Sequence, residues 1–329
     1  MSAKGRPERE CRSAQREGTP MRAARPSQGA SPPGGRRRAA LLRGDHANAM
    51  QMLSLPAPAK LNLFLHVTGR RADGYHTLES LFVLIARGDS ISLTARDDGA
   101  IVRTHGPPAI AADADLAVRA AQLLQRHCGV RQGVSIGVDK RLPMGSGLGG
   151  GSSDAASVLL GLNRLWALGL SRVDLMSVGL ELGADVPFFV FGEPAFAGGV
   201  GEELRATTFP TTWFTVITPS IEVRTGEIFS APELTRNSES AKMVVFSEGY
   251  GRNDLFPVAA ARFPEVARCL DALAREAPGS GARMTGSGAC VFAAFAAENA
   301  AQQALSRMPD GITGFVARSL DRHPLWRYA

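Results

Sequence analysis

The sequence predicts an α+β fold in two domains, and three observations lead to this prediction. From about Leu53 to the C-terminus, segments with the two-residue alternation of strands are interspersed with segments of helical periodicity. A turn signal at 70–74 and similar short connections indicate antiparallel hairpins, which argue against a doubly wound parallel sheet. The length of 329 residues suits about two domains, and a weak break near 205–212 places them at 52–208 and 209–329.

Residues 1–51 differ from the rest of the chain, and we expect them to form a disordered basic extension. They are rich in Arg, Ala, Gly, Pro and Ser and show no sustained apolar periodicity. Residues 1–50 hold 11 basic and 4 acidic residues, a net charge of +7, whereas the remainder holds 26 basic and 27 acidic residues. The overall charge of +6 is therefore no sign of a nucleic-acid-binding core. A basic arm, an organelle transit peptide and a wrongly assigned start, with Met50 or Met52 as the true first residue, stay open.

Composition excludes several classes of protein. Hydrophobic residues make up 44% of the chain and charged residues 21%, as in ordinary globular proteins. No apolar run approaches the roughly 18 residues of a membrane-spanning helix. The four cysteines are scattered without a C-x-x-C pair, so neither a zinc site nor a disulfide framework is indicated. Free thiols in a reducing cytoplasm are the expectation.

The first predicted strand, at 60–67, separates polar from apolar side chains. Lys60 and Asn62 fall on one face, and the apolar residues at 61, 63, 65 and 67 fall on the other. The strands expected after it in the first domain are 75–85, 90–95 and 133–139. The helices expected there are 113–127 and 152–168, and Ser171–Asp174 predicts a capping box for a third helix that ends near Gly183. In the second domain, strands are expected at 213–218, 290–295 and 314–319, and helices at 263–277 and 297–308.

The chemistry concentrates in a glycine-rich run that lies between a predicted strand and a predicted helix. Five of the seven residues in Gly145–Gly151 are glycine, which lets the backbone curl closely around a ligand with its N–H groups pointing inward. The start of the following helix adds unpaired N–H donors and a partial positive charge. Together these features predict a phosphate-binding site.

Three common phosphate-binding families do not fit this run. A dinucleotide-binding fold needs an acidic residue at the end of a second strand, but the corresponding position here follows a helix. A P-loop needs Gly-Lys-Ser/Thr, and the run contains no lysine. A protein kinase needs H-R-D and D-F-G, and the sequence contains neither.

The run and four other segments resemble the GHMP kinases, the family of galactose, homoserine, mevalonate and phosphomevalonate kinases. Residues 143–153 are similar to the central motif of the family, residues 58–63 to its first motif and residues 285–292 to its third. Residues 71–76 and 183–188 resemble one branch of the family, whose substrate carries a cytidine diphosphate. The resemblance runs in order from about Pro56 to the C-terminus. One departure is Ser146, where this branch commonly has a glycine, and it puts the conformation of the loop in doubt.

The resemblance implies a two-domain GHMP kinase fold with the active site in the cleft between the domains. It also implies an ATP-dependent phosphotransferase that acts on a hydroxyl of a small molecule with a cytidine diphosphate moiety, in isoprenoid precursor synthesis. Mg²⁺ is expected with ATP, and the resemblance assigns it no protein ligand. Neither a nucleic acid nor a membrane is an expected partner, and the oligomeric state is not assigned.

The residues that match the motifs receive the family's roles. Asp185 is the candidate base, because it lies between a helix end and an apolar run, and Lys60 is its catalytic partner. Tyr75 and Phe229 are expected to stack on the cytosine, and His76 to hydrogen-bond its edge. The substrate-binding set is Asn62, Tyr75, His76, Thr225 and Phe229. The ATP-binding set is Pro143, Met144, Gly145, Ser146, Gly147, Leu148, Gly149, Gly150, Gly151, Ser152 and Ser153.

Two other functions stay open at this point. One is a GHMP kinase with a different acceptor, against which Tyr75, His76 and Phe229 argue, because homoserine and mevalonate have no base to stack. The other is a non-catalytic binding protein that contacts nucleic acid through the basic arm, against which the presence of Lys60 and Asp185 argues.

Overall fold

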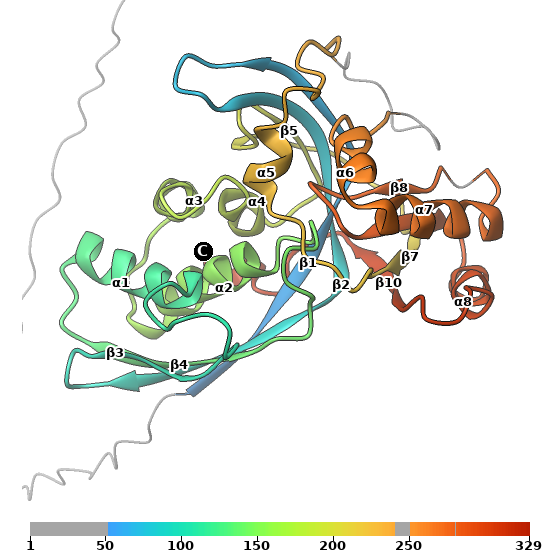
Figure 1. The fold of residues 1–329 in the computed structure, drawn as a ribbon. Helices are drawn as coiled ribbons and strands as arrows, with labels where there is room; N and C mark the ends of the chain where they lie inside the picture. The colour runs from blue at the N-terminus through green and yellow to red at the C-terminus, as the bar shows by residue number, and fades with distance from the viewer. Residues whose placement is uncertain (1–51, 241–250, 280) are drawn as a thin grey trace, which may run out of the picture. The chain divides into compact units, whose positions relative to one another are not determined.

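The computed structural model describes residues 52–240, 251–279 and 281–329. The predicted extension, residues 1–51, lies outside the described residues. Strands and helices mix along the described chain, which confirms the α+β class (Figure 1). The described residues belong to one compact unit, so the boundary expected at 208/209 stays a prediction.

The described residues form a ten-stranded sheet that runs through the whole of this unit. Its main path has the order β3-β4-β2-β10-β7-β9-β8, and β1, β5 and β6 pair beside it. The strands are β1 (Met52–Arg70), β2 (His76–Arg96), β3 (Ile101–His105), β4 (Gly133–Asp139), β5 (Ala195–Gly198), β6 (Glu203–Ala206), β7 (Trp213–Ile217), β8 (Arg283–Met284), β9 (Val291–Phe295) and β10 (Gly314–Leu320). Only β3 and β4 pair in parallel, so the hairpin-rich sheet expected from the turns is confirmed for the described part of the chain.

β2 corrects one prediction, because the strands expected at 75–85 and 90–95 are a single strand of 21 residues. Its pairing with β1 shifts between Ala59, which faces Ile85, and Pro58, which faces Gly88. The residues between form a bulge rather than a turn. Glycine is required there, since a Cβ on Gly88 would lie 2.1 Å from the carbonyl oxygen of Ala57. Gly88 therefore marks a close approach of two strands.

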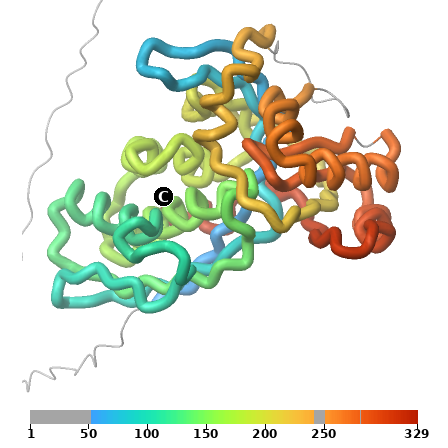
Figure 2. The backbone as a smooth tube through the Cα atoms, in the orientation of Figure 1, coloured from blue at the N-terminus to red at the C-terminus, as the bar shows by residue number. Residues whose placement is uncertain are grey.

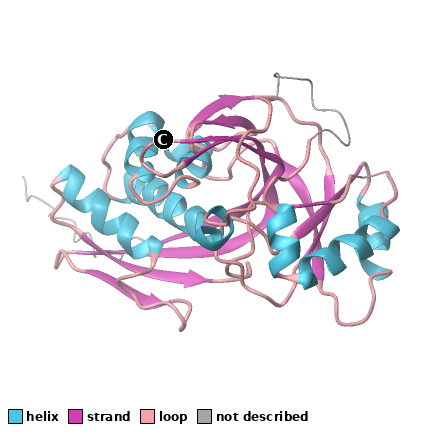
Figure 3. Cartoon of the chain, turned by 45° about the horizontal axis from the view of Figure 1, so that its top comes forward, coloured by secondary structure: helices cyan, strands magenta, loops and turns pink. Residues whose placement is uncertain are grey.

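Helices cover the sheet in two groups, one on either side of the long strands β1 and β2 (Figures 1 and 3). The first group is α1 (Leu116–Cys128), α2 (Gly150–Leu165), α3 (Arg172–Leu180) and α4 (Val186–Phe191). The second group is α6 (Phe256–Arg262), α7 (Pro264–Glu276) and α8 (Glu298–Ser306), and the short helix α5 (Thr225–Phe229) lies between the groups. The capping box at Ser171 is confirmed, because its hydroxyl accepts from the Asp174 backbone N–H while the Asp174 carboxylate accepts from the Ser171 N–H.

Each helix group packs its own apolar core, and a third cluster of side chains joins them. The first core lies between α1–α4 and the β1–β2–β4 part of the sheet. The second lies under α6 and α7, and the third is formed by β1, β2, β7 and β9. The C-terminal end returns among the helices of the first group (Figure 2). The active-site candidates therefore lie where two separately packed halves meet.

Two further expectations concern the described chain as a whole. Cys128, Cys269 and Cys290 are free thiols, as expected, and Cys11 lies outside the described residues. Among the described helices, none is both long enough and apolar enough to cross a membrane.

Candidate active site

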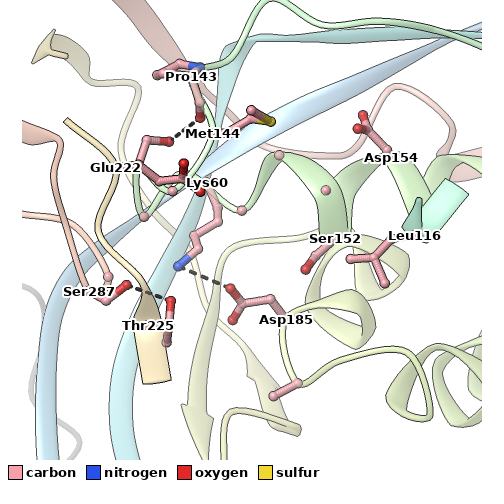
Figure 4. Close-up of a pocket in the computed structure, with 18 of the residues that line it drawn as sticks. Lys60, Leu116, Pro143, Met144, Ser152, Asp154, Asp185, Glu222, Thr225 and Ser287 are labelled. Atoms are coloured by element: carbon pink, nitrogen blue, oxygen red, sulfur yellow. Dashed lines mark hydrogen bonds and ion pairs between the residues drawn. The ribbon is translucent and has the colours of Figure 1, made fainter. Parts of the chain in front are cut away.

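A cavity of about 720 Å³ opens between the two halves, and most of the predicted site residues line it (Figure 4). β1 contributes Lys60 and Asn62, the glycine-rich run forms one wall, and the residue before α4 contributes Asp185. The second half contributes Thr225 and Phe229 from α5. The fold therefore brings together in one cavity Lys60 and Phe229, which lie about 170 positions apart in the sequence.

The glycine-rich loop has a conformation that only glycine adopts readily. Gly145, Gly147 and Gly149 have φ values of 57°, 76° and 72°, in the left-handed region. A Cβ on Gly147 would lie 2.1 Å from the carbonyl oxygen of Thr285. Ser146 does not share this conformation, because Ala167 is the only described non-glycine residue with a positive φ. The departure at Ser146 therefore leaves the loop conformation intact, and its hydroxyl donates to the Pro143 carbonyl at 2.7 Å.

The loop ends at Gly149, which is the N-cap of α2, so the first turn of a 16-residue helix faces the cavity. No side chain caps this end of the helix, which leaves its N–H groups available to an anion. Two residues of the predicted ATP set do not line the cavity. Leu148 is buried in the core, where its carbonyl accepts from the Lys60 N–H at 3.0 Å. The Ser153 hydroxyl is buried and donates to the Pro58 carbonyl at 2.7 Å.

Lys60 and Asp185 form an ion pair inside the cavity. The Lys60 ammonium nitrogen lies 3.5 Å from a carboxylate oxygen of Asp185 (Figure 4). The lysine is buried, whereas the Asp185 side chain is 36% exposed and faces the open space. The Lys60 ammonium also donates to Asn62 Oδ1 at 2.5 Å and lies over the Phe82 ring. These contacts fix the ammonium and leave one side of the Asp185 carboxylate accessible to a substrate hydroxyl.

Asn62 is held in a polar network that the sequence did not reveal. Its side-chain amide donates to Ser80 Oγ at 2.8 Å, and its backbone N–H donates to Thr285 Oγ1 at 2.9 Å. Ser80 in turn donates to the Phe64 carbonyl at 2.6 Å. Every member is buried, so the network fixes the Asn62 oxygen toward Lys60. Thr285 lies in the segment that resembles the family's third motif, and that resemblance is the one signal that could have identified it.

The predicted base-binding residues divide into two groups. Thr225 and Phe229 line the cavity, and Thr225 Oγ1 hydrogen-bonds Ser287 Oγ at 2.8 Å. Tyr75 and His76 do not line it, although the His76 ring lies against the Phe229 ring, with centroids 5.2 Å apart. The Tyr75 side chain is 62% exposed at the tip of the β1–β2 hairpin. His76 and Phe229 are thus brought together, and stacking between Tyr75 and a base stays a prediction.

A charged cluster lies beside the first turn of α2, where Lys140 and Asp154 also line the cavity, and no sequence pattern indicated this cluster. Lys140 forms ion pairs with Asp89 and with Asp154, the latter at 2.8 Å. Burial, the largest cause, outweighs the opposing effect of Lys140 and, together with the nearby Asp89 charge, raises the pKa of Asp154 to about 7. Asp154 Oδ1 is buried without a hydrogen-bond partner. The cluster joins β2, the strand end after β4 and the helix that carries the glycine loop.

The donor set of the cavity is compatible with a magnesium ion held mainly by phosphate. Within residues 52–240, 251–279 and 281–329, no cluster of three or more His, Cys, Asp or Glu side chains could form a protein cage for a metal. Asp185 provides an accessible carboxylate opposite the glycine loop. Mg²⁺ typically keeps several waters and binds one or two carboxylates together with substrate phosphates. The residues present therefore fit an ion that enters with ATP.

Comparisons with known proteins agree with this geometry. The model of the GHMP kinases N terminal domain matches residues 115–193, and that of the GHMP kinases C terminal matches residues 233–311. The chain is 58% identical over 275 residues to the 4-diphosphocytidyl-2-C-methyl-D-erythritol kinase of Thiobacillus denitrificans, which covers 84% of this chain and 98% of that protein. It is 52% identical to the enzyme of the same name from Aromatoleum aromaticum, over 85% of this chain and 98% of that protein.

Solved structures give the same result for the fold. A 4-(cytidine 5'-diphospho)-2C-methyl-D-erythritol kinase superposes with a TM-score of 0.70 and 32% identity, over 81% of this chain and 99% of that one. A homoserine kinase from Cytophaga hutchinsonii superposes with a TM-score of 0.61 over 83% of this chain and 95% of that one. Its identity of 17% shows the shared fold alone.

Proposed function

The chain belongs to the GHMP kinase family and is a small-molecule phosphotransferase, and we propose that it transfers the γ-phosphoryl group of ATP to the 2-hydroxyl of 4-diphosphocytidyl-2-C-methyl-D-erythritol. This reaction belongs to the non-mevalonate route to isoprenoid precursors. One observation carries the proposal: a glycine loop built for phosphates, a lysine–aspartate pair and an aromatic ring line the same cavity. Those three features are what a kinase of a cytidine-bearing alcohol needs.

In this proposal the glycine loop and the first turn of α2 bind the ATP phosphates. The contacts come from backbone N–H groups and from the positive end of the helix, so they need no cationic side chain in the loop. The Lys140 cluster beside this turn helps to hold the loop in place. Mg²⁺ would neutralise charge on the phosphates, and the accessible carboxylate of Asp185 could be one of its ligands.

The phosphoryl transfer itself requires mainly positioning and charge stabilisation, because the transition state is loose. The open side of the Asp185 carboxylate accepts a hydrogen bond from the acceptor hydroxyl and orients its oxygen toward the γ-phosphorus. Asp185 takes the proton as the new P–O bond forms, while the bond from the γ-phosphorus to the bridging oxygen breaks and that oxygen leaves with ADP. The Lys60 ammonium, 3.5 Å away, stabilises charge that develops on the transferred group and keeps the carboxylate in place.

The cytidine diphosphate end of the substrate would lie toward α5. Phe229 lines that end of the cavity, and Thr225 and Ser287 present hydroxyl groups to it. Tyr75 at the hairpin tip supplies a second ring that can close over the base. The free thiols of Cys128, Cys269 and Cys290 suit a reducing cytoplasm, which we propose as the compartment.

The test is a coupled assay of ADP release with three acceptors, namely the cytidine substrate, homoserine and mevalonate. We expect turnover with the cytidine substrate alone. Phosphorylation of homoserine or mevalonate at a comparable kcat/KM would assign the chain to a different acceptor within the family. A salt-dependent DNA-binding assay on the same preparation tests the non-catalytic alternative.

A further inference from the structure

Arg236 lies beside the base end of the cavity, and all five of its guanidinium N–H groups have acceptors. Its Nε–H donates to His76 Nε2 at 3.0 Å. The other four N–H groups donate to main-chain carbonyls at and just after the end of α5, those of Phe229 (3.2 Å), Ala231 (2.6 Å), Pro232 (3.3 Å) and Leu234 (3.0 Å). A guanidinium has five donors and no acceptor, so this one is fully used. Four backbone contacts thus fix the donor that faces His76.

In the hydrogen bond between Arg236 and His76, only one assignment of donor and acceptor is possible. Arginine stays protonated in proteins, so the guanidinium donates and His76 Nε2 accepts. Nε2 must therefore carry the lone pair, and the single proton of the neutral ring lies on Nδ1. The described residues give Nδ1 no hydrogen-bond partner, and Nδ1 is absent from their buried unpaired atoms, so it is open to solvent. His76 thus presents an N–H donor.

The electrostatic surroundings of His76 support the same state. Burial lowers the pKa of His76, and the charges of Arg236 and Arg70 lower it further. The His76 ring lies against Phe229, with an interplanar angle of 33°. The His76 ring is therefore neutral and lies beside the aromatic ring that lines the base end of the cavity.

We propose that Arg236 is a positioning residue that determines base specificity, because it locks His76 as a neutral Nδ1–H donor. This inference rests on the proposed function, since it assigns the recognition of the substrate's base. The N3 atom of cytosine is an acceptor and can receive this hydrogen bond. The N3 atom of uracil carries a hydrogen and cannot, so a uridine analogue would leave a donor facing a donor.

The test uses the full chain, with Arg236→Met, Arg236→Lys and a matched control, Arg262→Met. Arg262 also holds α5, through the Glu227 carbonyl at 3.1 Å, and pairs with Glu233, but among the described residues it makes no contact with His76. Nitrogen NMR of labelled histidine reports the tautomer of His76. We expect Nδ1–H in the wild type and in Arg262→Met, a shift toward Nε2–H in Arg236→Met, and partial retention of Nδ1–H in Arg236→Lys.

The functional readout is the preference for CDP over UDP in binding, and for the cytidine over the uridine substrate in kcat/KM. Both ratios should fall about tenfold in Arg236→Met, the effect of one lost base-edge contact. KM for ATP should stay unchanged, and Arg262→Met should keep both ratios. A change in stability alone would move neither ratio.

Three results would overturn the proposal. The first is a wild-type His76 with its proton on Nε2, and this measurement decides even if Arg236→Met fails to fold. The second is an unchanged tautomer in Arg236→Met, and the third is a changed tautomer with unchanged CDP to UDP preference. Absence of turnover with the cytidine substrate would instead refute the proposed function, while the tautomer and the CDP and UDP affinities would still test Arg236.

Discussion

The two ends of the cavity present different kinds of binding group. At the proposed phosphate end, the wall is a loop whose glycines adopt φ values open to almost no other residue, so main-chain N–H groups can face a ligand. At the proposed base end, the groups that we expect to bind the base are the side chains of Tyr75, His76 and Phe229, which come from a hairpin and a short helix. A backbone site is rigid and insensitive to most substitutions outside its glycines. A site made of side chains gives specificity, and each substitution of one of these side chains removes part of that specificity.

The reaction centre lies between these ends, and its loss should have the largest effect. Asp185→Asn keeps the size of the side chain but removes its charge and basicity, so we expect kcat to fall by at least ~10²-fold with little change in ATP binding. Lys60→Met should give a similar loss, and the double variant should be far less than additive, because the pair acts as a unit. Steady-state kinetics of the three variants measure this. The exposed Asp310→Asn serves as the control, and near-normal turnover in Asp185→Asn would remove the aspartate from the mechanism.

The next largest effect on the kinetics should come from adding one methyl group to the glycine loop, in the variant Gly147→Ala. Gly147→Ala combines a strained positive φ of 76° with a Cβ only 2.1 Å from the Thr285 carbonyl oxygen. Strain of this kind costs about 1–3 kcal/mol, and the overlap adds to it, so KM for ATP should rise by well over tenfold. Gly226→Ala is the matched control, since nothing lies within 4 Å of its Cβ position. ATP kinetics like the wild type in Gly147→Ala would show that the loop is not the rigid site described above.

Substitutions at the base end should change KM for the cytidine substrate but not KM for ATP. Tyr75→Ala and Phe229→Ala should each cost about 1–3 kcal/mol, the usual contribution of a ring stacked on a base. KM for the cytidine substrate should therefore rise, while KM for ATP stays nearly constant. Initial rates with each substrate varied in turn measure the split. If Tyr75→Ala raised both KM values equally, Tyr75 would be a packing residue that supports the whole cavity.

The same contrast explains what could be predicted from the sequence. The tight conformation of the glycine loop was predictable because it depends on local glycines and on the helix that follows, whereas its binding of phosphate stays a prediction. The shared face of Lys60 and Asn62 was predictable because strand alternation fixes it. The contact of Arg236 with His76 joins residues 160 positions apart and depends on how a hairpin and a helix pack, so no local pattern contains it. The strands expected separately at 75–85 and 90–95 form one strand with a bulge, because the bulge depends on the register of β1 against β2, which no local pattern contains.

The Lys140 cluster also could not be predicted from the sequence. Asp154 lies within an apolar helix, and the residues that pair with Lys140 come from different segments of the chain. The position of this cluster beside the first turn of α2 gives the phosphate end a support that contains titratable carboxylates, whereas Arg236 supports the base end through main-chain carbonyls and His76. Burial raises the pKa of Asp154 to about 7, against an ordinary value of 3.8. This difference connects the stability of the phosphate end to pH.

The smallest expected effect follows from the raised pKa of Asp154 and concerns stability rather than turnover. Below about pH 4 the Asp154 carboxyl is protonated in both the folded and the unfolded chain. Between about pH 4 and 7 the unfolded chain releases this proton while the folded chain keeps it, so this residue lowers the free energy of unfolding as the pH rises. Asp154→Asn cannot ionise, so the variant should lose this part of the pH dependence, and the Tm difference between variant and wild type should change by a few degrees across this range. The Tm of the control variant Asp310→Asn, whose substituted residue is exposed, should change with pH as the wild-type Tm does. A Tm difference between Asp154→Asn and wild type that stays constant from pH 4 to 7 would show that Asp154 is ionised throughout, with Lys140 rather than a proton compensating its charge.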